Sequence, residues 1–264
     1  MPDLSANNSP LIIGHRGASA FAPENTMAAF NLAIESGADG IEFDVRLTRD
    51  EIPVVIHDET LLRTGGVSQR VSDLSLEDLK QIDVGGWFGA KNRNCNFTGE
   101  RIPTLENLLR WAESNNARLY LEMKSDASRR QNLAGAVTEL LKHFDSERVV
   151  IESFDLEALK IIKVMAPHQK TAALFEPSLA TPPLIRARRL IELAREVEAD
   201  EIALHYRLVN KRIVKLALEN GLAVVVWTVD EPKWLDTARS LKVSAVITNN
   251  PKLLVVQRNS SVVG

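Results

Sequence analysis

Short apolar runs rich in Val, Ile and Leu alternate with amphipathic stretches along nearly the whole chain. This alternation is typical of successive βα units, which build a parallel sheet with helices on its faces. Nine of the runs have the length of a strand, and they cover residues 11–14, 40–47, 52–57, 118–123, 148–152, 170–175, 201–204, 222–228 and 244–248. The pattern therefore predicts a protein of the α/β class.

The second and third runs are joined by only four residues, 48–51. A crossover between parallel strands needs about a dozen residues or more, so these two runs are expected to form an antiparallel hairpin. Without the return strand of the hairpin, eight strands remain, with room for a helix between each consecutive pair. Eight strands close a TIM (β/α)8 barrel, which is the fold that we predict.

The stretch between the hairpin and the next strand is longer than one crossover helix requires. About 60 residues separate His57 from Arg118. We interpret residues 58–103 as an insertion over the mouth of the barrel. The sequence contains no repeat and no interdomain linker, so the whole chain, 1–264, is expected to form a single domain.

Length and composition fit this fold and exclude several classes of protein. A chain of 264 residues suits one barrel, which takes about 250. With 45% hydrophobic and 25% charged residues, the chain is neither disordered nor fibrous. A formal net charge of -3 disfavours an extended grip on the backbone of a nucleic acid. A small molecule is the expected partner, and the sequence leaves the oligomeric state open.

Cysteine content and hydropathy indicate where in the cell the protein is expected to act. Cys95 is the only cysteine, which excludes an intrachain disulfide and a thiolate metal cluster, so a free thiol is expected. The first ten residues are polar without a basic start, and nowhere do about 18 apolar residues follow one another. We therefore expect a cytoplasmic protein without stable insertion into a membrane.

Polar side chains interrupt the carboxyl ends of the first predicted strands, where a TIM barrel carries its chemistry. Glu42 and Asp44 lie two positions apart in one run, and Glu122 and Lys124 are spaced in the same way at the end of another. Alternate residues of a strand face the same side. We therefore expect these side chains to point together into the barrel mouth.

Three carboxylates buried together need a cationic partner, since each loses hydration while it repels the others. An all-oxygen site formed by Glu42, Asp44 and Glu122 is typical of a hard divalent ion, Mg²⁺ or Ca²⁺. In the alternative interpretation, the acids only pair with nearby basic side chains: Arg16, Lys124 and Arg46.

Two histidines lie beside these acids. His15 follows the first strand, and His57 ends the return strand of the hairpin. Alone, each would be interpreted as a structural histidine of the core. An imidazole pair, however, can take a proton from a nucleophile and give one to a leaving oxygen near neutral pH, so we expect a catalytic role for both. Of the remaining histidines, His143 and His168 are interpreted as surface residues, and the role of His205 stays open.

Arg16 and Lys124 complete an anion site. A forked guanidinium, an ammonium group and a divalent cation together form a phosphate cradle, whereas a carboxylate substrate would need less positive charge. The sequence thus predicts a phosphate ester as substrate. A second basic run is interpreted as a solvated helix face: Arg186, Arg188 and Arg189.

A series of short motifs follows along the chain: His15-Arg16-Gly17, Pro23-Glu24-Asn25-Thr26, Glu42-Phe43-Asp44-Val45, His57-Asp58, Pro103-Thr104-Leu105, Glu122-Met123-Lys124, Ser153-Phe154, Trp227-Thr228-Val229 and Thr248-Asn249 with Pro251. In this order and spacing, the chain resembles the glycerophosphodiester phosphodiesterase family over nearly its whole length. The resemblance implies a TIM barrel with a small insertion after the hairpin, a divalent metal ion on the three acids, the two histidines as acid and base, and phosphate contacts from Arg16 and Lys124.

The resemblance also concerns residues around this centre. It implies supporting roles for Asn25 and Trp227, which as bare sequence are a helix-start residue and a strand aromatic. Asp230 departs from the family pattern, which often has asparagine there, and its negative charge near the mouth offers a way to alter metal or substrate preference. Residues 243–245 replace the usual glycines, a change expected to affect packing only.

By this resemblance, the activity is metal-dependent hydrolysis of glycerophosphodiesters to glycerol 3-phosphate and an alcohol. Two alternatives remain open: a lyase that releases a cyclic phosphate, and a barrel that binds phosphate esters without catalysis. The motifs decide neither which histidine is the acid nor whether water or a glycerol hydroxyl attacks first. Aromatic residues of the insertion are placed to select the alcohol: Trp87, Phe88 and Phe97.

Overall fold

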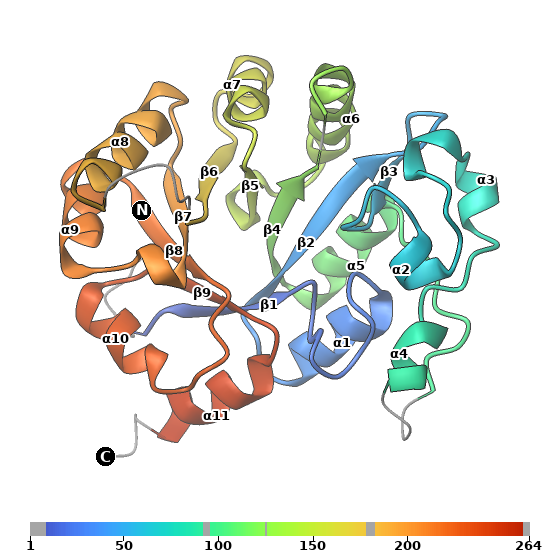
Figure 1. The fold of residues 1–264 in the computed structure, drawn as a ribbon, viewed down its shortest axis with the longest axis horizontal. Coiled ribbons are helices and arrows are strands. Elements are labelled where there is room, and N and C mark those ends of the chain that lie inside the picture. The colour runs from blue at the N-terminus through green and yellow to red at the C-terminus, as the bar shows by residue number, and fades with distance from the viewer. Residues whose placement is uncertain (1–8, 92–95, 125, 178–182, 261–264) are drawn as a thin grey trace.

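The strands form a closed barrel in the computed structural model, which describes residues 9–91, 96–124, 126–177 and 183–260 (Figure 1). The strands are β1 Leu11–His15, β2 Gly40–Leu47, β3 Pro53–Val55, β4 Arg118–Met123, β5 Val149–Ser153, β6 Lys170–Phe175, β7 Glu201–His205, β8 Ala223–Trp227 and β9 Ala245–Thr248. The sheet order is β1-β9-β8-β7-β6-β5-β4-β2-β3, and a parallel pairing of β1 with β2 closes it. Within the described residues, eight parallel strands form the closed ring, which confirms the TIM barrel.

The predicted hairpin is present. β3 pairs antiparallel with β2, and Val55 lies opposite Val45. β3 spans less than the predicted run 52–57. Ile56 still donates from its backbone N–H to the carbonyl oxygen of Asp44 over 2.9 Å, and the chain then turns into the insertion. His57 therefore lies just beyond the strand, in a loop.

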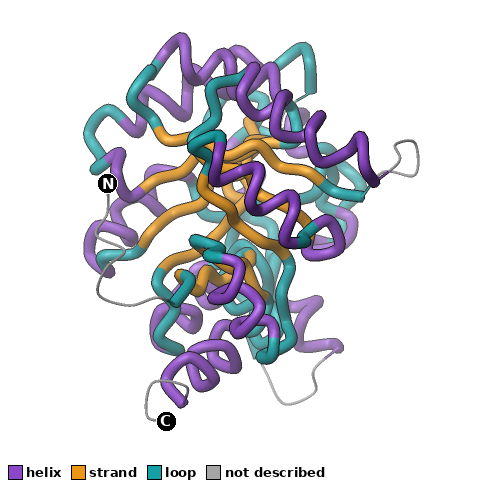
Figure 2. The backbone as a smooth tube through the Cα atoms, turned by 90° about the vertical axis from the view of Figure 1, so that its left-hand side faces the viewer, coloured by secondary structure: helices purple, strands orange, loops and turns teal. Residues whose placement is uncertain are grey.

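Helices surround the strands, as Figure 2 shows. They are α1 Met27–Glu35, α5 Leu105–Asn115, α6 Arg130–Leu141, α7 Leu156–Met165, α8 Pro183–Glu196, α9 Lys211–Glu219, α10 Trp234–Leu241 and α11 Pro251–Ser260, with the short 3-10 helices η2 Ser146–Arg148 and η3 Tyr206–Leu208. α1 begins at Thr26, whose hydroxyl accepts a hydrogen bond from the N–H of Ala29. In the part of the chain that the structure describes, none of the helices has the length and apolar character needed to cross a membrane.

The alternation of side chains along each strand separates an outer core from the barrel interior. Outward residues such as Phe43 on β2 and Leu121 on β4 pack against the helices in the larger apolar cluster. Inward residues such as Ile13 and Leu174 form a smaller cluster inside the barrel. The inward positions toward the carboxyl ends of β2 and β4 are instead acidic, so the sheet itself aims the polar residues at the mouth.

The described residues of the insertion, 58–91 and 96–103, lie to one side of the barrel, at the right of Figure 1. They contain α2 Leu62–Gly65, η1 Val71–Asp73, α3 Leu76–Leu79 and α4 Gly86–Lys91. A separate apolar cluster, which includes Leu61 and Leu79, packs this stretch against Val54 of β3. Cys95 falls outside the described residues, so its free thiol stays a prediction.

Candidate active site

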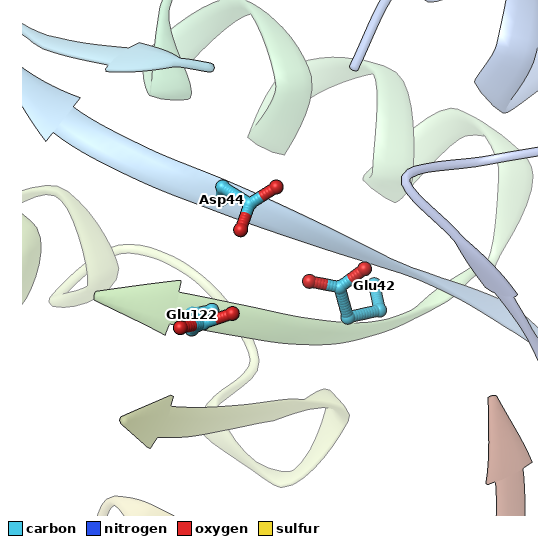
Figure 3. Close-up of side chains that lie close together, drawn as sticks. All are labelled: Glu42, Asp44 and Glu122. Atoms are coloured by element: carbon cyan, nitrogen blue, oxygen red, sulfur yellow. The ribbon is translucent and has the colours of Figure 1, made fainter. Parts of the chain in front are cut away.

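Three carboxylates meet toward the carboxyl ends of β2 and β4 (Figure 3). Glu42 and Asp44 come from β2, and Glu122 comes from β4, where it lies opposite Asp44 in the strand register. The three residues are buried, and each offers an oxygen atom within 4.8 Å of those offered by the other two. The predicted metal ligands are therefore brought together in space.

Arg16 and Lys124 bring positive charge to these acids. Arg16 Nε lies 3.2 Å from Asp44 Oδ2, and the backbone N–H of Arg16 donates to Glu42 Oε2 over 2.9 Å. Lys124 Nζ lies 2.7 Å from Glu122 Oε1 and 3.3 Å from Asp44 Oδ1. Both predicted phosphate-binding side chains thus border the acid cluster.

The turn after β1 fixes the position of Arg16. Arg16 and Gly17 both adopt positive φ angles, of 53° and 85°. A Cβ atom on Gly17 would lie 2.5 Å from the backbone carbon of Ala29. Only glycine allows the turn to approach α1 this closely, and the approach holds the Arg16 backbone N–H at Glu42.

Arg46 bonds to backbone carbonyl groups rather than to the acids, within the described residues. Its Nε donates to the carbonyl oxygen of His57 over 2.8 Å, and its Nη1 donates to that of Lys124 over 3.4 Å. Arg46 therefore links the loop that carries His57 to Lys124, which follows the end of β4. The alternative interpretation, in which the acids only pair with basic side chains, loses one of its three proposed partners.

The acids differ in proton affinity. Burial raises the pKa of Glu42 well above its ordinary value, and the charge of Asp44 adds to this effect. Burial and Asp44 also raise the pKa of Glu122 to about 7. Burial alone would raise the pKa of Asp44, but Arg16 and Lys124 outweigh it and hold that pKa well below the usual range. A cation bound among the acids would oppose both effects and favour the ionised forms of Glu42 and Glu122.

The donor set fits a hard divalent ion. The candidate ligand atoms are all carboxylate oxygens, which are the ligands preferred by Mg²⁺ and Ca²⁺. Asp44 Oδ1 is buried and has the ion pair with Lys124 Nζ at 3.3 Å, but it accepts no hydrogen bond of good geometry from the described residues. A buried carboxylate oxygen that is only partly compensated is unfavourable, and a metal ion would satisfy it. The cluster of Glu42, Asp44 and Glu122 is therefore compatible with a divalent metal ion.

His15 is oriented by residues from the other end of the chain. Its Nδ1 atom lies 2.7 Å from Asn249 Oδ1, while Asn249 Nδ2 donates to Asp230 Oδ2 over 2.7 Å. Because the amide nitrogen is committed to Asp230, the amide oxygen accepts the proton of His15 Nδ1. The other ring nitrogen, Nε2, then faces Glu42 Oε2 at 3.8 Å. Asp230, the departure from the family pattern, thus acts on the orientation of Asn249.

A second network holds His57. Its Nδ1 atom lies 2.7 Å from Asp58 Oδ1, and Asp58 Oδ2 accepts a hydrogen bond from Arg63 Nε over 2.6 Å. Arg63 also donates to Glu24, which accepts a further hydrogen bond from Arg16 over 2.7 Å. A continuous chain of charged groups therefore links the imidazole of His57 to the guanidinium of Arg16.

Both imidazoles favour the neutral form. Burial, followed by the charge of Arg16, lowers the pKa of His15 to about 4. Burial also lowers the pKa of His57 below its ordinary value, while Asp44 and Asp58 act in the opposite direction. The Nδ1 atom of each imidazole is hydrogen-bonded to an oxygen atom, so Nε2 is the ring nitrogen that can exchange a proton with a ligand.

Asn25 and Trp227 also border the centre. Asn25 precedes α1 and donates from Nδ2 to Asp44 Oδ2 over 2.8 Å, so it is both a helix-start residue and a support of this acid. Trp227 ends β8, and its ring meets those of Phe154 and His205 edge to face, at centroid distances of 5.6 and 5.2 Å. His205, left open by the sequence, thus packs against Trp227.

A cavity of about 170 Å³ connects these groups, and we call it the central cavity. Its lining includes both histidines, both predicted phosphate-binding residues, Glu42, Glu122, Glu152 and Trp227. A larger cavity of about 350 Å³, the outer cavity, shares Glu122, Lys124 and Phe154 with it. A ligand bound at the acid cluster can therefore extend into either space.

The insertion contributes to the outer cavity through Glu59, Val71 and Ser72. The aromatic residues expected to select the alcohol instead pack on one another: Trp87, Phe88 and Phe97. Phe88 is buried, whereas Trp87 and Phe97 are half-buried beside it, and none of the three lines the central or the outer cavity.

The remaining sequence expectations concern residues away from the candidate site, both on the surface and in the core. His143 and His168 are exposed, as predicted. Arg188 and Arg189 are exposed on α8, which confirms the solvated face for these two, whereas the side chain of Arg186 lies outside the described part of the chain. Residues 243 and 245 are buried and pack in the core, in line with a structural role.

Sequence reasoning missed several residues of the site. Asp58 follows His57 directly, and Asn249 stands in the Thr248-Asn249 motif, so both were signalled by the motifs without an assigned role. Arg63 had no signal, because its role depends on the fold of the insertion. Glu152 lies one residue before the Ser153-Phe154 motif, and only the closed barrel brings it to the central cavity.

The fold and this site define a class of protein, the TIM-barrel enzymes that act on phosphate esters beside a carboxylate cluster compatible with a metal ion. The model of the glycerophosphoryl diester phosphodiesterase family matches residues 15–253. The glycerophosphodiester phosphodiesterase of Caldanaerobacter subterraneus subsp. tengcongensis is 36% identical over 246 residues, which cover 93% of this chain and 96% of that protein. The chain belongs to the glycerophosphoryl diester phosphodiesterase family.

Further relatives support this assignment. The glycerophosphodiester phosphodiesterase of Bacillus subtilis is 30% identical over 260 residues, covering 92% of this chain and 84% of its own length. A phosphodiesterase of Oleispira antarctica, solved with the product sn-glycerol-3-phosphate, superimposes with a TM-score of 0.83 at 26% identity, over 95% of this chain and 97% of that one. The family resemblance seen in the sequence is confirmed.

Proposed function

We propose that the chain hydrolyses glycerophosphodiesters to glycerol 3-phosphate and a free alcohol, with Mg²⁺ or Ca²⁺ held by Glu42, Asp44 and Glu122. The observation that carries this proposal is the arrangement around the central cavity, where the acid cluster, two basic side chains and two oriented imidazoles converge. The phosphodiester would lie in this cavity, between the acids and the imidazoles.

Arg16 and Lys124 bind the free oxygens of the phosphate. Both already contact the acids, so they are held in place before the substrate arrives. Fixed positive charge stabilises the negative charge that grows on the phosphoryl oxygens in the transition state without further reorganisation. When bound, a divalent ion supplies additional charge neutralisation and polarises the phosphoryl group.

His15 and His57 act as the general acid and base through their Nε2 atoms. One ring, in its neutral form, takes the proton of the attacking hydroxyl at Nε2. The other ring must enter the step as the imidazolium, which the negative charge of the bound phosphate favours, and it then gives its Nε2 proton to the oxygen of the departing alcohol. Their orientation by Asn249 and Asp58 supports this role, since binding alone would not need an oriented pair of proton carriers. Asn25 and Trp227 keep Asp44 and the cavity wall in place.

The test is an assay with glycerophosphocholine, followed by phosphorus NMR of the products. We expect turnover with Mg²⁺ or Ca²⁺, its loss in a chelator and its recovery when the ion is restored. Glycerol 3-phosphate should accumulate. A persistent cyclic phosphate would favour the lyase instead, full turnover in chelator would remove the metal ion from the proposal, and binding without turnover would leave a non-catalytic barrel.

Three further expectations from the sequence stay proposals. The chain forms one domain, 1–264, with an insertion at 58–103 that borders the alcohol side of the site. It acts in the cytoplasm. Its substrate is a small molecule, and neither a nucleic acid nor a membrane is a stable partner.

A further inference from the structure

Arg63 is a charged residue of the insertion to which the mechanism above gives no role. It lies on α2, whose start is fixed by Leu61, a buried member of the apolar cluster of this stretch. The guanidinium group stands over the ring of Trp87 on α4, 5.8 Å from the ring centroid. The insertion thus supports the guanidinium from two of its helices, while 39% of the side chain stays open to solvent.

Two carboxylates from different segments bind this guanidinium. Nε and Nη2 of Arg63 donate to Oδ2 and Oδ1 of Asp58, over 2.6 and 3.0 Å. Nη1 and Nη2 donate to Oε2 and Oε1 of Glu24, over 2.6 and 2.8 Å. Glu24 belongs to the turn between β1 and α1, whereas Asp58 follows the hairpin. One planar group therefore bridges the two segments, with a pair of hydrogen bonds to each.

Each of the two carboxylates also holds a side chain of the proposed site. Asp58 Oδ1 lies 2.7 Å from His57 Nδ1, and Glu24 Oε1 accepts a hydrogen bond from Arg16 Nη1 over 2.7 Å. These are the same two oxygen atoms that Arg63 Nη2 contacts. Without the guanidinium between them, the carboxylates would face each other as like charges at short range and would repel. The position of each carboxylate therefore depends on Arg63.

We propose that Arg63 is a positioning residue for both halves of the reaction: through Asp58 it holds the imidazole of His57, and through Glu24 it holds the guanidinium of Arg16. This inference rests on the proposed function, and it gives the insertion a part in the reaction other than the choice of the alcohol. The role requires arginine, because the ammonium group of lysine is a point charge and cannot hold two carboxylates by paired, coplanar hydrogen bonds.

Steady-state kinetics with glycerophosphocholine at saturating metal ion test the proposal. In Arg63→Ala, KM should rise about fivefold as Arg16 loses its position, and kcat should fall about five- to tenfold as His57 loses its own. Arg63→Lys keeps the charge and should stay within about threefold of Arg63→Ala in kcat/KM. Arg101→Leu is the matched control and should leave both constants unchanged. Arg101 is exposed in the same insertion and is not among the described residues that line the two cavities.

Free guanidinium ion provides a readout that a merely structural role would not move. Because the Arg63 side chain is partly exposed, the space that Arg63→Ala opens can be reached from solvent. A guanidinium ion bound there can form the hydrogen bonds to both carboxylates again. At about 20 mM, far below denaturing concentrations, guanidinium chloride should raise kcat/KM of Arg63→Ala about threefold or more. Methylammonium chloride at the same concentration should not, and neither salt should activate the unaltered protein.

Two further measurements test the route of the effect. Adding Arg63→Ala to the double variant Glu24→Gln and Asp58→Asn should lower kcat/KM by less than about twofold, since Arg63 acts through those two carboxylates. Calorimetric titration with inorganic phosphate needs no turnover. Arg63→Ala should weaken phosphate binding about fivefold through the displaced Arg16, and guanidinium chloride should restore part of the affinity.

Several outcomes would overturn the inference. Normal constants in Arg63→Ala would do so, and full activity in Arg63→Lys would mean that charge alone is needed. A loss that guanidinium does not relieve, together with a lower stability in urea titrations, would make Arg63 a structural residue. If Arg63→Ala does not fold, the kinetics and phosphate affinity of Arg63→Lys decide. Absence of turnover in the unaltered protein would refute the hydrolysis instead, and the phosphate titrations would still judge the hold of Arg63 on Arg16.

Discussion

Asp58→Asn is the substitution that most directly probes the role of His57. Asp58 Oδ1 lies 2.7 Å from His57 Nδ1, and Arg63 holds the carboxylate from its other side. The hydrogen bond to Arg63, followed by that to His57, lowers the pKa of Asp58 to about 2, so the group is an anion at neutral pH. Asparagine keeps the shape and one acceptor oxygen but removes the charge.

The expected loss follows from the difference between a charged and a neutral hydrogen bond. A hydrogen bond to a charged group contributes about 1.5–3 kcal/mol and a neutral one about 0.5–1.5 kcal/mol, a difference of about 1–1.5 kcal/mol. The Asp58 side chain is 24% exposed, and solvent screening favours the lower value. At about 1.4 kcal/mol for each factor of ten, kcat should fall about five- to tenfold. Because Asp58 raises the pKa of His57, the limb of the pH profile that reports this ring should also move to lower pH.

The assay is the pH dependence of kcat for glycerophosphocholine between about pH 5 and 9, at saturating metal ion. Asp236→Asn is the matched control, because it removes an exposed carboxylate that pairs with Arg239 on α10, away from the site. Adding Asp58→Asn to His57→Ala should cost nothing further if Asp58 acts only through that ring. An unchanged rate and profile, or an equal loss in the control, would refute the reasoning.

Two further predictions concern the histidines and the stability of the barrel. His15→Ala and His57→Ala should each lower turnover by about two orders of magnitude or more with an unchanged circular dichroism spectrum, and near-normal rates in either variant would make that ring structural. Burial raises the pKa of Glu201 to about 7, so the folded state carries an unfavourable charge above that pH, whereas the unfolded state ionises near 4.5. Stability is therefore lost as pH rises between these values. Glu201→Gln should raise the free energy of unfolding at pH 8 by on the order of 1–3 kcal/mol and should change it little near pH 4.5. Urea titrations at pH 8 and pH 4.5 would measure this difference, and an equal effect at both pH values would contradict the linkage.

The polar centre could be predicted largely because strand parity is a local property. Glu42 and Asp44 sit two residues apart, so any strand through them turns both side chains to one side. The apolar residues at the alternate positions 41, 43 and 45 mark the other side as the core. The barrel then requires the acid of β4 to join them. His57 was placed near the centre even though β3 ends before it, since the loop leaves the hairpin beside Asp44.

The surroundings of the two imidazoles could not be predicted in this way. His15 and Asn249 are 234 positions apart, and Arg63 reaches Glu24 across 39. Such contacts depend on ring closure and on how residues 58–103 fold against the barrel, and no periodicity of the sequence encodes either. The aromatic residues expected to select the alcohol illustrate the same limit, because their rings pack on one another and do not line the outer cavity.

The order of apolar runs, the hairpin and the shared face of the acids follow from the sequence by itself, because each depends on residues within a few positions of one another. The tertiary structure decided which distant groups meet: Asp230 with Asn249, Arg63 with Glu24, and Glu152 with the central cavity. The physical reason is that a side chain's period along a strand is fixed locally, whereas its partner across the barrel is fixed only when the last strand pairs with the first.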